Sequence, residues 1–86
     1  MTAQPDDPRT WTTRDHRAYA SLFAMLRGRI ETNHYTPGKR IPSIAELCIE
    51  TGLSRQTVGR ALRHLERVGL VMCAAGLGYF VTDPDD

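Results

Sequence analysis

Basic and amide side chains recur at helical spacing between residues 55 and 68. With about 100° of rotation per residue, one face of this predicted helix carries Gln56, Arg60, Arg63 and Arg67. The opposite face is apolar and consists of Val58, Ala61, Leu62, Leu65 and Val68. Guanidinium groups attract phosphates, and arginine and glutamine can each form paired hydrogen bonds with base edges. The pattern predicts a helix that reads DNA; the alternative is the solvated face of an ordinary amphipathic helix.

The basic face is preceded by a predicted helix and a tight turn. Ser43 and Glu46 have the spacing of a capping box that opens the first of the two helices. Gly52 ends that helix, because glycine adopts the left-handed conformation without strain, and Ser54 caps the next one. This arrangement is typical of the helix-turn-helix, whose second helix lies in the major groove. The segment 55–68 is therefore predicted to be the recognition helix.

Three further elements must position these two helices. Apolar residues recur every three or four positions from about 14 to 33, which predicts an amphipathic first helix. Residues 70–73 and 79–82 are predicted strands joined by a glycine-bearing turn over 74–78. Residues 39–41 are a candidate for one very short strand. The predicted fold is mainly α with a small β-hairpin: a winged helix-turn-helix of three helices plus a wing.

Charge is unevenly distributed along the 86 residues, although the formal net charge is only +1. Residues 1–13 are predicted to be a flexible N-terminal arm with a net charge of −1, and residues 83–86 form an acidic tail with −3. Since the parts must add up to +1, the domain predicted over residues 14–82 carries +5, which favours a polyanionic partner. Trp11, near the end of the arm, either folds back onto the domain or ends an unstructured lead.

Nothing in the sequence has the spacing of a metal or catalytic site. Cys48 and Cys73 form no CxxC or cysteine–histidine motif, and small buried thiols are their expected role. His16, His34 and His64 lie on separate segments and are expected on the surface. No pairing of a nucleophile with a base can be argued, so neither an enzyme nor a bound cofactor is expected.

Three other features are excluded by simple patterns. Gly76 and Gly78 lie between two strands rather than at the start of a helix, which argues against a phosphate-binding loop. Residues 1–9 contain no apolar run of the kind found in signal peptides. No stretch approaches the ~20 apolar residues of a membrane span. A cytoplasmic protein without a membrane partner is expected.

Several closely spaced motifs follow one another in order between the two ends of the chain. They are Tyr35–Ser43, Ala45–Leu47, Gly52–Val58, Ala61–Leu65, Gly69–Val71 and Gly76–Val81. Together they resemble the DNA-binding domain of the GntR-type regulators. The resemblance implies a winged helix and a bacterial transcription factor, usually a repressor, that binds palindromic operators as a dimer.

By this resemblance, the Ser-Arg-x-Thr segment at the start of the recognition helix touches DNA. Ser54 and Thr57 would hold phosphates, while Arg55 and Gln56 would approach base edges. Gly76 at the wing tip would let the backbone enter the minor groove. The predicted DNA-binding set is completed by Ser43, Arg60 and Arg63.

The chain departs from the family pattern at three places. A DNA-contacting arginine often stands where this chain has Ala45, and another where it has Gly59. The wing strand is often basic, whereas residues 73–75 carry no charge. Arg60 and Arg63 are the candidates to compensate, and only a weak contact from the wing is expected.

The predicted function is sequence-specific binding of duplex DNA by a transcriptional regulator of the repressor type. Two alternatives stay open: an architectural or excision-type DNA-binding protein, and a winged helix used for protein–protein contact. Because the sequence ends at Asp86, no small-molecule effector domain is expected, and the Met-Thr-Ala start favours a free-standing regulator over a fragment. The isolated chain is expected to be a monomer or a weak dimer that pairs on a palindromic operator.

Overall fold

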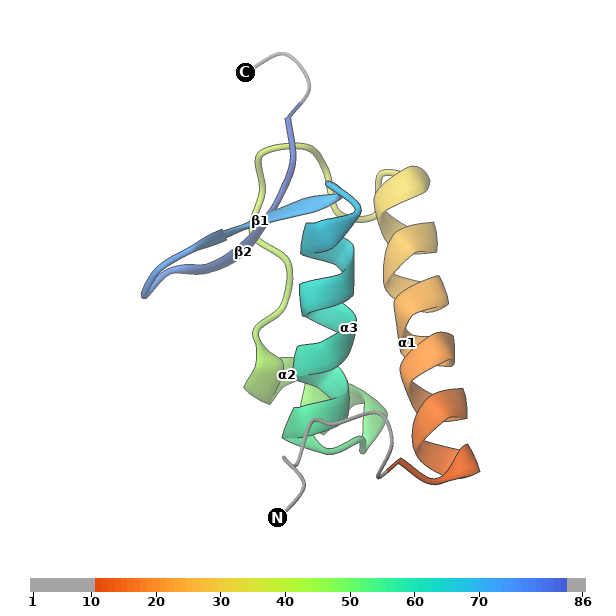
Figure 1. The fold of residues 1–86 in the computed structure, drawn as a ribbon. Coiled ribbons are helices and arrows are strands. Elements are labelled where there is room, and N and C mark those ends of the chain that lie inside the picture. The colour runs from red at the N-terminus through yellow and green to blue at the C-terminus, as the bar shows by residue number, and fades with distance from the viewer. Residues whose placement is uncertain (1–10, 84–86) are drawn as a thin grey trace.

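Three helices and one β-hairpin follow one another along residues 11–83, the part of the chain that this computed structural model describes (Figure 1). The helices are α1 (Thr13–Glu31), α2 (Ile44–Thr51) and α3 (Arg55–Arg67), and the strands are β1 (Val71–Ala74) and β2 (Gly78–Val81). Their order and types confirm the predicted winged helix-turn-helix. The ends of the elements differ from the predicted ones by one or two residues, and Val68 is the C-cap of α3 rather than its last residue.

Side chains close the N-termini of the helices as the local sequence predicts. At α1, Thr12 Oγ1 accepts a hydrogen bond from the Asp15 N–H, and the Asp15 carboxylate accepts one from the Thr12 N–H. Ser43 and Glu46 form the same capping box at α2. These hydrogen bonds hold the pKa of the Asp15 and Glu46 carboxyls below their usual range. Gly52 ends α2 with a φ of 74°, which allows the sharp turn into α3.

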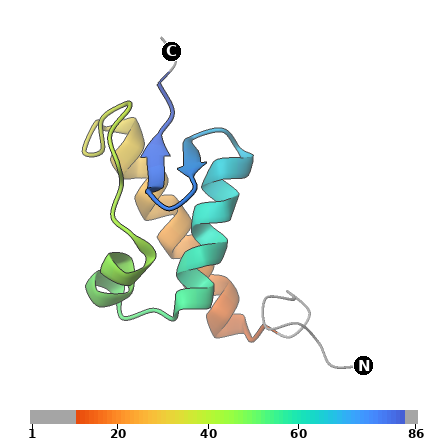
Figure 2. The same cartoon turned by 90° about the vertical axis from the view of Figure 1, so that its left-hand side faces the viewer.

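The hydrophobic core lies where the other elements meet α3. Helix α1 packs along α3, beside it in Figure 1 and behind it in Figure 2, while α2 and the hairpin lie on another side of α3. The buried apolar residues are Leu22, Leu26, Ile41, Leu47, Val58, Ala61, Leu62, Leu65, Val71 and Val81. Full burial of one leucine contributes about 1.5–3 kcal/mol. This cluster therefore fixes which face of α3 remains outside.

The hairpin is joined to the segment that leads into α2. Strands β1 and β2 form an antiparallel two-stranded sheet. The candidate short strand 39–41 is present only as an isolated bridge between Arg40 and Phe80. Backbone hydrogen bonds of 2.9 Å donated by Ile41 and Val81 flank that bridge. These bonds anchor the wing beside the N-terminus of α2.

Trp11 folds back onto the domain, which decides between its two predicted positions. Its ring centroid lies 3.6 Å from the central guanidinium carbon of Arg60 and 5.5 Å from the ring of Tyr19. A cation over the face of an indole is attracted by the ring quadrupole. Residues 1–10 of the predicted arm and residues 84–86 of the predicted tail lie outside the described residues.

The expectation that His64 is a surface residue is wrong. Its ring is half-buried between α1 and α3, and it stacks on Phe23 with 4.0 Å between centroids and on Tyr19 with 5.6 Å. Its Nδ1 is hydrogen-bonded to the Tyr19 hydroxyl. Tyr19 and Phe23 are four residues apart and therefore share one face of α1. This aromatic pair forms the surface against which the imidazole packs.

Leu47→Ala should lower the free energy of unfolding by about 2–5 kcal/mol, because it leaves a cavity in the core. Leu47 is the fully buried side chain through which the eight-residue helix α2 reaches that core. Ile49→Ala is the matched control on the same helix, since 85% of Ile49 is exposed, and it should change stability by less than about 0.5 kcal/mol. Urea unfolding measures both. Equal losses in the two variants would contradict this packing of α2.

Candidate nucleic-acid interface

Helix α3 leaves one narrow polar face exposed. The exposed residues are Arg55, Gln56, Arg63, Glu66 and Arg67, whereas residues 57–62 are all buried. With about 100° of rotation per residue, the exposed side chains occupy an arc of roughly 120°. We call this set the α3 arc. Its three arginines outnumber its single acid, so the arc attracts anions.

The prediction that Arg60 belongs to this exposed face is wrong. Only 7% of Arg60 is exposed, and its guanidinium lies over the Trp11 ring. On the helical wheel, Arg60 stands about 40° beyond Gln56, in the direction of His64, which packs against α1. How much of α3 is covered on this side depends on tertiary packing with α1 and Trp11. The wheel alone therefore could not exclude Arg60.

The three hydroxyl residues predicted to touch DNA take part in the N-terminal caps of α2 and α3. Ser54 Oγ accepts a hydrogen bond from the Thr57 N–H at 3.2 Å and donates one to Thr57 Oγ1 at 3.0 Å. Ser54 is exposed, but Thr57 is only 5% exposed. Ser43 caps α2 and is half-buried. Of the predicted phosphate-binding pair, Ser54 thus lies at the surface and Thr57 supports it from inside.

The wing leaves the body beside α3 and has an uncharged tip (Figure 1). Gly76 lies in the exposed turn with a φ of 76°, a conformation that side chains rarely adopt. Leu77 next to it is 67% exposed. The tip therefore offers backbone groups and apolar surface instead of a cation. Gly76 thus comes from a separate element, whereas Arg55, Gln56 and Arg63 share the α3 arc.

Arg40 is a basic residue near this surface that the sequence patterns did not single out. Its stem lies along the wing, close to the turn, since a Cβ added to Gly78 would be 3.4 Å from Arg40 Cδ. Its guanidinium lies 3.4 Å from the carboxylate of Glu46 in the first turn of α2. Arg40 therefore sits between the wing and α2. No spacing marks it, because its position follows from the bridge to β2.

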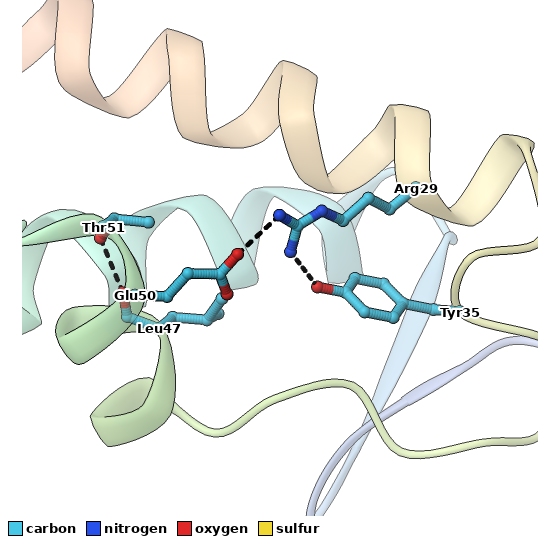
Figure 3. Close-up of polar contacts among 5 residues, drawn as sticks. All are labelled: Arg29, Tyr35, Leu47, Glu50 and Thr51. Carbon is cyan, nitrogen blue, oxygen red and sulfur yellow. Dashed lines mark hydrogen bonds and ion pairs between the residues drawn. The ribbon is translucent and has the colours of Figure 1, made fainter.

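One arginine ties α2 to the end of α1 (Figure 3). Arg29 donates hydrogen bonds to the Glu50 carboxylate at 2.6 Å and to the Tyr35 hydroxyl at 2.5 Å. The bond from Arg29 holds the pKa of the Glu50 carboxyl below its usual range, and the same pair raises the pKa of Arg29. Because Glu50 belongs to α2 and Arg29 to α1, this contact orients the first helix of the helix-turn-helix.

Residues 18–81 match the family described as bacterial regulatory proteins, gntR family. The chain belongs to this family. The match runs from the second turn of α1 to the end of β2, and it confirms the resemblance predicted from the ordered motifs.

Individual gntR-family relatives and structures are similar to this chain. The Histidine utilization repressor of Pseudomonas putida is 41% identical over 66 residues, which cover 77% of this chain and 27% of the repressor. The HTH-type transcriptional regulator Rv1152 of Mycobacterium tuberculosis is 32% identical over 84 residues, 91% of this chain and 69% of that regulator. The structure of AraR(DBD) in complex with operator ORR3 has a TM-score of 0.74 and 31% identity, covering 76% of this chain and 78% of that one. The chain spans about a quarter of the length of the histidine utilization repressors that it matches.

Three other features of the described residues bear on the predictions from sequence: possible metal ligands, the two cysteines and the hydrophobicity of the helices. Within residues 11–83, no group of three or more histidine, cysteine or acidic side chains is placed to hold a metal ion. Cys48 is half-buried, but Cys73 is exposed, so the expected burial of both thiols is wrong for Cys73. The reason is that β1 leaves the core after Val71. No helix of these residues is both long and apolar enough to cross a bilayer.

Glu50→Gln should make folding stability less dependent on pH in the acid range. The folded-state pKa of Glu50 lies below its ordinary value of 4.5. Its contact with Arg29 therefore contributes stability above that value, and the contribution is lost as the pH falls through the folded-state pKa. The variant should have a lower urea midpoint than the parent at pH 7, and the two midpoints should converge as the pH falls through the folded-state pKa of Glu50.

The matched control for this experiment is Glu31→Gln. Glu31 pairs with Arg27 one turn earlier on the exposed side of α1, and exposed pairs of this kind contribute little. Its urea midpoint at pH 7 should stay close to that of the parent. If Glu50→Gln shifted the midpoint no more than Glu31→Gln did, the contact would not hold α2.

Proposed function

We propose that this chain is a sequence-specific transcriptional regulator of the repressor type that binds duplex DNA with α3 in the major groove. The observation that carries the proposal is the α3 arc: three arginines and a glutamine stand on the exposed side of a helix whose other sides are packed. A helix fits the width of the major groove, and cations on it balance phosphate charge. The likeness to AraR(DBD), solved in complex with operator ORR3, supports the same class of partner.

The contacts proposed for α3 divide between bases and phosphates. Arg55 and Gln56 lie exposed in the first turn and approach base edges, where each can form paired hydrogen bonds. Ser54 and the N–H groups of this turn face a phosphate, which a helix N-terminus favours. Thr57 acts through Ser54, to which it is hydrogen-bonded. Arg60 is assigned to packing and not to DNA, because it is buried.

A second set of contacts surrounds the helix. Ser43 at the start of α2 and Arg40 beside it are proposed to face the phosphate backbone. Gly76 brings the backbone of the wing toward the minor groove. Because residues 73–78 carry no charge, the wing adds little to the electrostatic part of binding. The chain is proposed to act by binding alone and not as an enzyme, in keeping with a family of regulatory proteins.

Arg55→Ala should weaken binding to the selected operator by about 1–3 kcal/mol, because it removes a bidentate contact with a base. The operator is first obtained by selecting bound duplexes from a random pool, and affinity is then measured by fluorescence anisotropy at fixed salt. Arg27→Ala removes the same charge from the exposed side of α1 and should leave the affinity nearly unchanged. Equal weakening by both variants would contradict base reading by α3. A pool that yields bent DNA without a consensus sequence would favour the architectural alternative.

The operator is proposed to be palindromic, with one copy of the chain on each half-site. Two recognition helices reach the same face of the duplex when half-site centres lie about 10–10.5 base pairs apart. Inserting five base pairs between the half-sites should therefore abolish paired binding, and inserting ten should restore the correct face. Sedimentation of the protein with each duplex counts the bound copies. One copy bound with full affinity to an isolated half-site would contradict the dimer.

A further inference from the structure

Gly59 occupies the middle of α3, where glycine is a poor helix former, yet this position is buried. Among the described residues, no atom of another helix lies within 4 Å of a Cβ built on Gly59, so packing against another helix does not explain its burial. A Cβ built on Gly59 would meet a single atom within 4 Å outside its own neighbourhood, Arg63 Nη1 at 3.4 Å. The guanidinium of Arg63 thus covers Gly59.

The direction of Arg63 follows from helix geometry. Side chains on an α-helix lean toward its N-terminus, and residues four apart lie above one another. Arg55, Gly59 and Arg63 therefore form one column along α3, with the buried glycine between two arginines of the α3 arc. The contact with Gly59 shows that Arg63 extends one turn back along this column. Its charged end thus lies level with the middle of the helix, closer to Arg55 than its Cα is.

A second observation concerns the charge of Arg63 and the wing. Burial raises the pKa of the Tyr79 hydroxyl on β2, whereas the positive charge of Arg63 lowers this pKa.

We propose that Gly59 is a positioning residue that lets the Arg63 guanidinium lie across α3, and that Arg63 thereby reads a guanine in the operator. The inference rests on the proposed DNA-binding function and adds to it a specificity-determining pair. Arginine forms two hydrogen bonds with guanine O6 and N7, which demands a defined position of the guanidinium. A Cβ at position 59 would stand 3.4 Å from Arg63 Nη1, at the lower edge of ordinary van der Waals contact, and would leave the guanidinium no room to move closer to the helix.

Gly59→Ala tests the positioning role, with Gly28→Ala as its matched control. Both glycines lie inside helices, but a Cβ on Gly28 would meet nothing within 4 Å. Alanine favours the helix at either site, so both variants should have a raised urea midpoint. Gly59→Ala alone should bind the selected operator more weakly, by at most the about tenfold to hundredfold that the loss of one bidentate base contact would give.

Arg63→Lys tests the reading role and does not depend on how Gly59→Ala folds. Lysine keeps the charge but lacks the planar fork of arginine. Selection from a random pool should therefore lose its guanine preference at one position per half-site, while the dependence of affinity on salt stays as in the parent. Gly59→Ala should lose the preference at the same position.

The outcomes separate this inference from the proposed function. If the parent chain selects no sequence, the proposed function itself fails. If the parent selects a site and Arg63→Lys selects the same site with the same preference, only the reading role is overturned. If Gly59→Ala weakens binding equally on the operator and on random duplex, Gly59 serves close approach of the DNA backbone, and the positioning role is overturned.

Discussion

The packing of α1 against α3 decides what this domain can present to a partner. Leu22 and Leu26 of α1 are buried in the same cluster as the apolar stripe of α3, and the ring of His64 is held between α1 and α3 by Tyr19 and Phe23. These contacts set the rotation of α3 about its own axis. Since α2 and the hairpin cover another side, only the α3 arc remains at the surface, and every proposed base contact comes from it.

The second constraint is the orientation of α2, which is only eight residues long. A helix of two turns has little stability of its own, so its place must come from tertiary contacts. Leu47 supplies the apolar one, and Glu50 the polar one through Arg29. The wing is held in a related way, through the backbone bridge at residue 40 and the stem of Arg40 on Gly78. Helix α2, and with it the turn into α3, is thus held by contacts with α1 through Arg29 and with the wing through Arg40.

The features that could be predicted from the sequence are those that short-range physics determines. The capping boxes at residues 12–15 and 43–46, the glycine turn at Gly52 and the hairpin all depend on residues within a few positions of one another. Arg60 and His64 were assigned wrongly because their surroundings come from residues about 45 or more positions away: Tyr19 for His64, and Trp11 for Arg60. A helical wheel gives the direction of a side chain but not what covers it.

The burial of Arg60 changes how the charge of the domain must be interpreted. The +5 of residues 14–82 includes a cation held under an indole ring, so the sum overstates what α3 offers to phosphates. With an uncharged wing tip and one arginine of α3 withdrawn, general electrostatic attraction to DNA is reduced. Selectivity then depends more on where the remaining guanidinium groups stand than on how many there are. Gly59 lowers the stability of α3, because glycine is a poor helix former. In return, it lets the guanidinium of Arg63 lie against the helix, and a defined position of the guanidinium is what base reading requires.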